Sequence, residues 1–574
     1  MHVQHSSVGE CCEVSKILIT SAWPYISVTP HLGNLVGSIL SADVVARYYR
    51  LRGDDVIMVS GSDEHGTPIE VESIKQGVSP KELTDKNHAY VTELFQKWGA
   101  SFDNYTRTES PVHKKFVQDL LMKIYNNGYI FSKEIQMLYC KHDNRYLPDR
   151  FVEGTCPNCN CTKARGDQCD MCGRLLEPTS LIDPYCVLCN NTPIVKTTTH
   201  WYIDLSKLSS KLEKYLTDNQ QLPVTAKNFS LNWIKEGLKP RAVTRDIAWG
   251  IPAPFPGAEG KTIYVWVEAV LGYLSATIEY SQNIGEPEKW RDFWLNKKAK
   301  TFYFVGKDNI PFHTIILPAL LLASGEDYNL PWNVSVTEFL QFKGKKASKS
   351  QRVGIWIDEA LEMFPVDWWR FFLLATRPET KDSNFSWDSF REKINSDLND
   401  TFGNFIHRTL KFINSKFESK IPEPINLSPA DKSILETIKN KVEAISDNFE
   451  NLQLQSATNA LISLSRLGNQ YLNENEPWNL MKTNKQKAAN VFFVSAQIVK
   501  AIAIVSAPFM PNTAKKICQI LNFSTDKNTV TWNDALIPLK AGHEINKPEP
   551  LFNKIDDDED QLENKLKSIR QRHS

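Results

Sequence analysis

The sequence predicts an α/β fold in which a parallel sheet is interrupted by a cysteine-rich insertion and followed by an all-α bundle. Three observations predict it: strand–helix patterns recur at two distant places, eight of 11 cysteines lie between Cys140 and Cys189, and the chain after about Asn395 is patterned almost entirely as helix. Among the 574 residues, 41% are hydrophobic and 23% charged, which is globular composition. The zero net charge excludes a wholly basic nucleic-acid coat, although not a local basic patch.

The first strand–helix pattern lies near the N-terminus. Lys16–Ala22 is a short apolar run typical of a buried strand. Thr29 is predicted to cap a helix that Pro30 opens and that runs over His31–Arg50. A second buried strand follows at Asp55–Ser60, so this region predicts a strand–helix–strand unit of a parallel sheet.

The same pattern recurs at Lys300–Val305, a predicted strand, and Pro311–Ala323, a predicted helix. Because the cysteine-rich block lies between the two patterns, an insertion into one sheet is the simplest arrangement. In the helical part, six residues at helical spacing predict one buried stripe: Leu398, Phe402, Phe405, Ile406, Thr409 and Ile413.

Two later segments need individual interpretation. Val491–Met510 is about long enough to span a bilayer, but Gln497 and Lys500 near its centre favour a buried helix of the bundle. After the acidic run Asp556–Asp560, helical spacing predicts a short amphipathic piece with three apolar positions: Leu562, Leu566 and Ile569. The N-terminus lacks the pattern of a signal peptide.

The cysteine spacing indicates metal ligation, since six of the clustered cysteines form three CxxC pairs without secretory features. One set has the spacing of a closed four-thiolate zinc site: Cys156, Cys159, Cys169 and Cys172. A second site could use Cys140, Cys186 and Cys189 together with either His142 or Asp143.

Two motifs suit phosphate binding at the carboxyl ends of the predicted strands. Pro30–Asn34 (PHLGN) opens the first helix, where free N–H groups and the positive dipole end attract anions. Far downstream, Lys345–Ser350 (KKASKS) places lysines and small residues in a loop between Gly344 and Gly354, which suits a phosphate clamp. The chain contains neither G-x-G-x-x-G nor a P-loop, which excludes those two kinds of nucleotide site.

Together, HLGN and KASKS resemble the HIGH and KMSKS signatures of class I aminoacyl-tRNA synthetases. Neighbouring segments narrow the resemblance to the methionyl-tRNA synthetase family, of the archaeal or eukaryotic kind: SAWPY, GSDEHGTPIE, TRDIAWGIP, YVWVEAVLGY and VGKDNIPFH. The resemblance runs from about Ile17 to at least Trp478. It implies a Rossmann-like catalytic domain with a zinc-knuckle insertion, followed by a helical-bundle anticodon-binding domain.

The resemblance implies a methionine–tRNA ligase that forms AMP. ATP and methionine would give methionyl-adenylate, and the methionyl group would pass to the 3′ end of tRNA(Met), including the initiator tRNA. ATP, with Mg²⁺, would be bound by His31, Gly33, Asn34, Asp308, Lys346, Ser348 and Lys349. The catalytic residues would be His31, Asn34, Lys346, Lys349 and Arg245.

By the same resemblance, the methionine pocket would be lined by Trp23, Tyr25, Asp63, Trp266, Tyr273 and His313. Asp63 would hold the ammonium group, and an aromatic wall suits the polarizable sulfur. Trp23 departs from the family's usual Leu. Asp143 is another departure, because the family's two-zinc members have a CxxC pair at Cys140.

In the helical part, Asn404 and Arg408 lie one turn apart, opposite the apolar stripe. A solvated polar face explains this spacing by itself. The resemblance implies instead that both residues read the anticodon together with Trp478, which opens a later helix at Pro477-Trp478.

The predicted organisation has seven parts: a loose tail (1–15), a first catalytic half (16–127), the insertion (128–244), a second catalytic half (245–340), a KMSKS-loop and stem-contact region (341–395), an anticodon-binding domain (396–540) and a C-terminal tail (541–574). Two alternatives remain: a sister class I synthetase for isoleucine, valine, leucine or cysteine, or a non-catalytic zinc-containing tRNA-binding protein. We expect a cytoplasmic monomer without a membrane, with one or two zinc ions and a tRNA-binding partner supplied separately.

Overall fold

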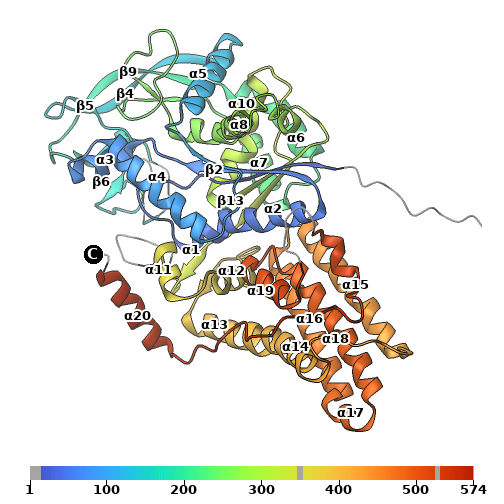
Figure 1. Cartoon of the computed structure of the whole chain (residues 1–574). Coiled ribbons are helices and arrows are strands. Elements are labelled where there is room, and N and C mark those ends of the chain that lie inside the picture. The colour runs from blue at the N-terminus through green and yellow to red at the C-terminus, as the bar shows by residue number, and fades with distance from the viewer. Residues whose placement is uncertain are drawn as a thin grey trace, which may run out of the picture.

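The computed structural model describes residues 14–166, 169, 171–172, 174, 176–345, 353–523 and 530–572. Most of the predicted tail and the loop residues Lys346, Ser348 and Lys349 therefore lie outside the described residues. The α/β part with its insertion lies above the helical bundle in Figure 1, and the chain passes from one to the other through α11 (Ile357–Met363) and α12 (Val366–Ala375). This confirms the predicted fold class.

A five-stranded parallel sheet forms the centre of the α/β part, in the order β14-β13-β1-β2-β3. Its strands are β1 (Lys16–Ser21), β2 (Asp55–Ser62), β3 (Asn104–Arg107), β13 (Lys300–Gly306) and β14 (Asn333–Thr337). The three predicted strands are confirmed, with ends that differ by at most two residues. Because the strand order reverses between β1 and β13, the carboxyl ends of these two strands frame the crevice where such sheets bind ligands.

The helix after β1 starts later than predicted. Its parts are α1 (Leu32–Asn34), a π-helical turn η1 (Leu35–Ile39) and α2 (Leu40–Arg52). The prediction that Thr29 caps this helix was wrong, because His31 is the N-cap. The chain stays extended up to His31, since Pro30 accepts a hydrogen bond from Ile357 and Leu32 donates one to Ile355. Gly53 ends the helix in the left-handed conformation.

Helices cover both faces of the sheet. After β13 the chain forms η5 (Lys307–Asn309), η6 (Phe312–Ile316) and α10 (Leu317–Ala323), which confirms the predicted helix. Helix α8 (Val265–Asn283) packs against β2 and β3. The remaining helices of this part are α3 (Thr67–Gln76), α4 (Pro80–Lys97), α5 (Pro111–Asn126), α6 (Ser209–Asp218), α7 (Val224–Lys235) and α9 (Arg291–Trp294).

The insertion is built on a long antiparallel pair, β4 (Ile130–Cys140) and β9 (Ile194–Ile203). Shorter strands are β5 (Arg145–Tyr146), β6 (Val152–Thr155), β7 (Ala164–Arg165), β8 (Ile182–Cys186), β10 (Arg241–Ala242), β11 (Thr244–Arg245) and β12 (Thr262–Ile263). The 3₁₀ turn η2 (Asp149–Phe151) leads into β6. All described cysteines other than Cys518 lie in this insertion.

The bundle follows a short parallel pair, β15 (Leu340–Phe342) and β16 (Ser383–Phe385). Its helices are η7 (Lys393–Gly403), α14 (Asn404–Lys416), α15 (Pro429–Glu450), α16 (Leu454–Asn475), α17 (Pro477–Thr483), α18 (Lys485–Val505) and α19 (Pro511–Ile520). The predicted apolar stripe from Leu398 to Ile413 is buried throughout, as expected. Helix α18 is long and apolar enough to cross a membrane, but its apolar window is entirely buried, so it is the predicted core helix with shifted ends.

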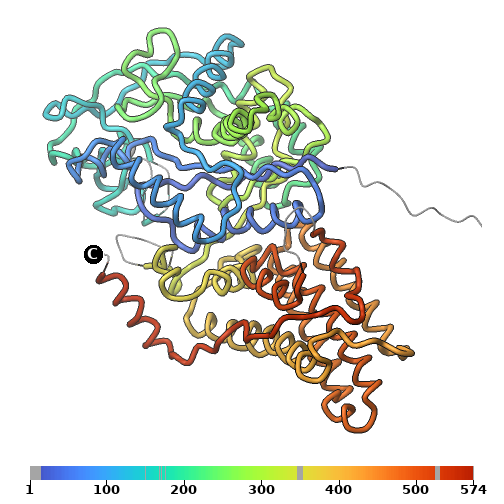
Figure 2. The backbone as a smooth tube through the Cα atoms, in the orientation of Figure 1, coloured from blue at the N-terminus to red at the C-terminus, as the bar shows by residue number. Residues whose placement is uncertain are grey.

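Several contacts join the bundle to the α/β part, among them a buried ion pair and a C-terminal helix. Arg370 on α12 (Val366–Ala375) and Asp43 on α2 form a buried ion pair of 2.6 Å, and Arg370 also donates hydrogen bonds to the carbonyls of Trp98, Pro508 and Phe509. Figure 2 shows the chain after α19 crossing the bundle back toward α11 (Ile357–Met363). There α20 (Glu559–Arg572), the predicted amphipathic piece, buries its three apolar positions, and Arg570 pairs with Glu359 at 2.7 Å.

Candidate active site and anticodon face

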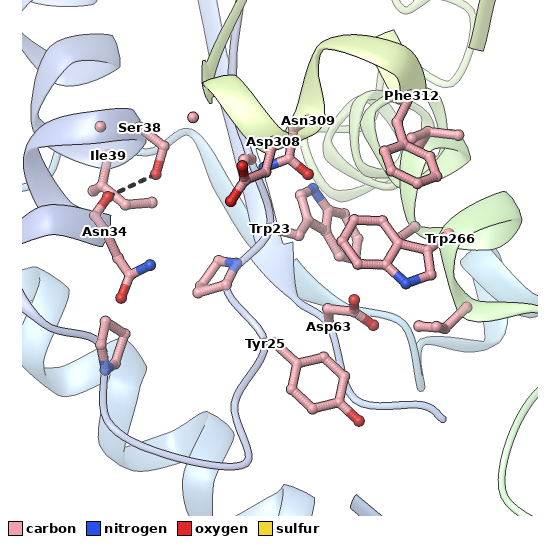
Figure 3. Close-up of a pocket in the computed structure, with 18 of the residues that line it drawn as sticks. Trp23, Tyr25, Asn34, Ser38, Ile39, Asp63, Trp266, Asp308, Asn309 and Phe312 are labelled. Atoms are coloured by element: carbon pink, nitrogen blue, oxygen red, sulfur yellow. Dashed lines mark hydrogen bonds between the residues drawn. The ribbon is translucent and has the colours of Figure 1, made fainter. Parts of the chain in front are cut away.

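One cavity of about 600 Å³ opens at the carboxyl ends of β1, β2 and β13. All described residues of the predicted ATP and methionine sets line it: Trp23, Tyr25, His31, Gly33, Asn34, Asp63, Arg245, Trp266, Tyr273, Asp308 and His313. Figure 3 shows Asn34 and Ser38 on one side of this cavity and Trp266 and Phe312 on the other, with Asp308 between them. The sheet therefore gathers residues from five sequence regions around one space.

His31 has an imidazole that caps the helix of the HLGN segment. Its Nδ1 accepts hydrogen bonds from the backbone N–H of Gly33 at 3.0 Å and of Asn34 at 3.3 Å, and Asn34 Oδ1 accepts one from the His31 N–H. Burial lowers the pKa of His31 to about 4, so the ring is neutral and Nε2 carries the proton. A Cβ atom on Gly33 would lie 2.9 Å from this ring, which is the reason for glycine there.

The cavity's cationic residues come from two distant segments. Arg245 lies on β11, and its guanidinium stacks over the Tyr264 ring at 3.6 Å. Arg150 comes from the turn η2 inside the insertion and also lines the cavity. Arg150 was not predicted from the sequence. The only indication in the sequence is that Arg150 shortly precedes Cys156, where the first CxxC pair begins. Because Arg150 belongs to the insertion and lines the cavity, it connects the cysteine-rich lobe to the pocket.

The apolar end of the cavity contains a buried tyrosine–histidine pair. His313 Nδ1 donates to the carbonyl of Asn309 at 2.9 Å, so its Nε2 accepts from the Tyr273 hydroxyl at 2.7 Å. Burial lowers the pKa of His313 to about 4 and keeps it neutral. Trp266 is 41% exposed and stacks on Phe312 with ring centroids 4.4 Å apart. Phe312 was not predicted.

Trp23 also lines the cavity, and its indole packs against neighbouring backbone. Cβ atoms on Gly61 and Gly272 would lie 2.8 and 2.6 Å from its ring, so the two glycines make room for the indole. The ring centroid of His113 lies 5.7 Å from that of Trp23. Trp23, which stands where the family usually has Leu, therefore packs against the backbones of Gly61 and Gly272, where no side chain competes for the space.

Asp63 directly follows β2 and Tyr25 lies in the segment after β1, and the backbones of these two residues form a bridge. In Figure 3 the Asp63 carboxyl is drawn between Tyr25 and Trp266. Its Oδ1 is buried and has no hydrogen-bond partner among the described residues. Burial and the charge of Glu268 raise the pKa of Asp63 well above its usual value, while the charge of His65 opposes them. An incoming ammonium group would satisfy this oxygen and favour the ionised carboxylate.

The insertion brings its cysteines together in two groups, and the possible ligand atoms of each lie within 4.8 Å of one another. In the first, sulfur atoms of Cys156 and Cys172 lie 3.9 Å apart and those of Cys159 and Cys169 3.6 Å apart. A tetrahedral zinc with Zn–S bonds of about 2.3 Å places its sulfurs about 3.8 Å apart, so this set fits the ion.

The second group contains Cys140, Asp143, Cys186 and Cys189. Asp143 Oδ2 lies 3.2 Å from Cys140 Sγ and 3.0 Å from Cys186 Sγ. His142 is not part of this group; its side chain is 66% exposed and lies 3.0 Å from the other Asp143 oxygen. Three thiolates and one carboxylate are an acceptable zinc set, and the structure places Asp143 rather than His142 in it.

The predicted anticodon residues meet on one face of the bundle. Asn404 and Arg408 lie on α14, and the Arg408 guanidinium lies 5.1 Å from the ring centroid of Trp478 on α17. Glu476, in the left-handed conformation, makes the sharp turn from α16 into α17 and so sets the position of Trp478. An aromatic ring beside an arginine is suited to stacking an unpaired base. Asn473 accepts a hydrogen bond of 3.5 Å from Arg408 and was not predicted.

Comparison with known proteins gives consistent results over the whole chain. A family model described as tRNA synthetases class I (M) matches residues 17–410, and one described as the anticodon binding domain of methionyl tRNA ligase matches residues 421–571. The chain is 51% identical over 544 residues to the methionine–tRNA ligase of Thermofilum pendens, which covers 95% of this chain and 96% of that protein.

Two further similarities agree with this. The methionine–tRNA ligase of Caldivirga maquilingensis is 52% identical over 542 residues, or 94% of this chain and 92% of that protein. The fold is similar to the crystal structure of Mycobacterium tuberculosis methionyl-tRNA synthetase bound by methionyl-adenylate, with a TM-score of 0.78 at 22% identity, covering 94% of this chain and 100% of that one.

Proposed function

The chain belongs to the methionine–tRNA ligases, a family of class I tRNA synthetases, and from that premise we propose how its pocket works. Methionine is activated with ATP to methionyl-adenylate and is then transferred to the 3′ end of tRNA(Met), including the initiator tRNA. One observation carries this proposal: a single cavity is lined by both the phosphate-motif residues and the aromatic residues expected around methionine.

In the first step the methionine carboxylate attacks the α-phosphate of ATP, and pyrophosphate leaves with its Mg²⁺. Such a displacement depends on alignment and charge neutralisation rather than on a protein nucleophile. His31 is set to donate from Nε2 to a phosphate oxygen, because its Nδ1 already accepts two backbone N–H groups. Asn34 would contact the phosphates and sugar of the nucleotide, and Asp308 would lie near its ribose.

Arg245, which lies on β11, would neutralise the negative charge of the phosphates. Lys346 and Lys349 would close on the leaving pyrophosphate. The two lysines, with Ser348, lie outside the described residues, so their role rests on the sequence motif. Lys349→Ala should therefore abolish most adenylate formation, because one such donor contributes about 3–4 kcal/mol in comparable enzymes.

Methionine would bind with its ammonium group at Asp63 and its side chain toward the tyrosine–histidine pair. The thioether sulfur is a weak hydrogen-bond acceptor and makes favourable contacts with aromatic rings. Trp23, Tyr25 and Trp266 supply those rings. A branched aliphatic side chain has no sulfur to contact these rings, which favours methionine over isoleucine, valine and leucine.

Zinc would be held by Cys156, Cys159, Cys169 and Cys172, and more weakly by the group that includes Asp143. Bound there, it would supply a structural cross-link for a lobe whose buried side chains are few. The lobe in turn places Arg150 at the pocket.

Asn404, Arg408 and Trp478 would read the anticodon. We propose the domain division given above, with 16–127 and 245–340 as catalytic halves and 396–540 as the anticodon-binding domain. The chain would act in the cytoplasm, as a monomer that can take a separate tRNA-binding protein.

The test is amino-acid-dependent ATP–pyrophosphate exchange with each of the twenty amino acids. We expect exchange with methionine alone at physiological concentrations. Exchange with isoleucine, valine, leucine or cysteine instead would assign the chain to a sister synthetase. No exchange with any amino acid, together with retained tRNA binding, would favour the non-catalytic alternative.

A further inference from the structure

A buried histidine lies directly behind the pocket without lining it. His65 sits in the turn from β2 to α3, two residues after Asp63, and its side chain is 1% exposed. Its Nδ1 lies 2.8 Å from Glu268 Oε1, and its Nε2 lies 2.7 Å from Glu109 Oε1. Because an ionised carboxylate only accepts hydrogen bonds, both ring nitrogens donate and the ring is an imidazolium.

The main chain of the same residue supports two pocket side chains. The Tyr25 hydroxyl donates to the His65 carbonyl at 2.8 Å. The His65 backbone N–H faces the Asp63 carboxyl and helps to lower the pKa of that group. The side chain of His65 is meanwhile anchored to α8, the helix that carries Trp266 and Tyr273.

Charged groups face His65 from every element packed around it. Glu268 comes from α8, Glu109 from the loop after β3, and Asp63 and Glu64 from the end of β2. Glu109 also pairs with Lys114 on α5 at 2.5 Å, and Glu64 pairs with Arg107 on β3 at 2.8 Å. Among the uncharged neighbours, the Trp249 ring meets His65 edge-on at 5.5 Å. On α5, His113 is kept neutral because burial and the charge of His65 lower its pKa.

The balance of these groups keeps the ring charged. Burial by itself would lower the pKa of His65, but the charge of Glu268 and the hydrogen bonds to Glu109 and Glu268 outweigh it and raise the pKa to about 10. The charge of His65 lowers the pKa of Asp63, which burial and the charge of Glu268 raise. Without that cation, the charges of Glu268 and Glu64 would no longer be opposed by His65, and Asp63 would take up a proton more readily.

We propose that His65 is a positioning residue of the methionine pocket: its imidazolium, held between Glu268 and Glu109, fixes the turn that carries Asp63 against helix α8, holds the carbonyl to which the Tyr25 hydroxyl donates, and keeps the Asp63 carboxylate ready for the ammonium group of methionine. This inference rests on the proposed function, because it assumes that Asp63 binds that ammonium. His65 itself touches neither substrate, since it does not line the cavity.

The main test is His65→Gln in methionine-dependent ATP–pyrophosphate exchange. We expect the KM for methionine to rise by about tenfold to a hundredfold, the loss typical of a misplaced binding group, while the KM for ATP stays within about twofold. His88→Gln is the matched control: His88 is a neutral, half-buried histidine nearby that bonds to Ser62 instead of Glu109 or Glu268. It should leave both constants unchanged.

A second variant separates charge from packing. His65→Gln combined with Glu268→Gln removes one cation and the anion that faces it, so it should restore part of the lost methionine affinity. A purely structural role would make the double variant worse than the single one.

Glu109→Gln is the alternative variant if His65→Gln does not fold. Glu109 is more exposed than His65 and Glu268, so its replacement should disturb the packing less. Removing its charge lowers the pKa of His65, so the alkaline limb of kcat/KM for methionine should move to lower pH. Equal rises in the KM for methionine and for ATP, or an alkaline limb that stays in place, would overturn the proposal. Absence of methionine-dependent exchange in the wild type would instead overturn the proposed function.

Discussion

At the scale of single residues, the polar groups at the apolar end of the pocket are defined by their hydrogen bonds. His313 is anchored through Nδ1 to the Asn309 carbonyl, so its Nε2 accepts from Tyr273. Both side chains are buried, and His313 is neutral at physiological pH because burial lowers its pKa. Tyr273 is therefore the donor of this pair, and both side chains line the cavity.

Tyr273→Phe should weaken methionine binding. The change leaves His313 Nε2 buried without its donor, so the hydrogen bond no longer fixes the His313 ring in the wall of the pocket. The KM for methionine should then rise about tenfold or more, the loss typical of a misplaced binding group. The KM for ATP should not change. Pyrophosphate exchange measures both, and Tyr280→Phe on the same helix is the control, since Tyr280 lies outside the pocket. An unchanged KM for methionine would mean that the pair only fills space.

At the scale of elements, the cysteine-rich lobe contains two groups of different chemistry. The four-thiolate group fits zinc by spacing and by ligand type, whereas Asp143 supplies a carboxylate to the second group. Thiolates bind zinc more tightly than one carboxylate does in such sites. The lobe should therefore hold its two ions with unequal strength.

Freshly purified protein should contain between one and two equivalents of zinc, and mild chelation should reduce this to one. Asp143→Cys completes a second four-thiolate set and should make both equivalents resist the chelator. His142→Ala should have no effect, because His142 lies outside the group. Elemental analysis before and after chelation tests all three proteins. Zinc lost from both sites together in the wild type would contradict the asymmetry.

At the scale of the whole molecule, the two candidate sites lie in separate bodies. The pocket lies at the carboxyl edge of the sheet, while Asn404, Arg408 and Trp478 lie on helices of the bundle (Figure 1). The buried Asp43–Arg370 pair joins the two bodies through α2, the continuation of the HLGN helix. Activation needs only ATP and methionine, so the anticodon face should matter only when tRNA docks.

Trp478→Ala should leave pyrophosphate exchange unchanged but raise the tRNA concentration required for aminoacylation by roughly tenfold or more. Loss of one stacked base costs about 1–3 kcal/mol. Trp478→Phe keeps an aromatic face and should restore most of the activity. The comparison uses methionine tRNA and a copy with a changed anticodon. If the Trp478→Ala variant discriminates between the two tRNAs as well as the wild type does, the surface formed by Asn404, Arg408 and Trp478 is only a solvated polar face.

Stability should depend on pH through the buried histidines. Burial lowers the pKa of His113 to about 3 and of His31, His88 and His313 to about 4, below the value of about 6.5 in an unfolded chain. Between these values the unfolded state binds more protons, so stability should fall as pH falls from 6.5 toward 4.

His65 acts in the opposite direction. Its folded pKa of about 10 lies above the unfolded value, so its contribution is complete below about pH 6.5 and is lost as pH rises to 10. Urea unfolding across pH 4–10 should therefore show maximal stability near neutrality, and His65→Gln should flatten the alkaline side. An alkaline side of unchanged slope would mean that His65 is not charged in the folded protein.

The sequence by itself determined the α/β class, the buried stripe of the bundle, the zinc-ligand spacing and eleven of the residues that line the pocket. All of these depend on local periodicity or on motifs in which nearby residues act together. Only the tertiary structure decided that His31 rather than Thr29 caps the first helix, because the extended pairing of that segment with 355–357 comes from far along the chain. The same holds for Arg150 reaching the pocket and for the imidazolium of His65, whose partner Glu268 is 203 residues away. Sequence spacing contains no information about such contacts, since they form only when the sheet brings distant segments to one edge.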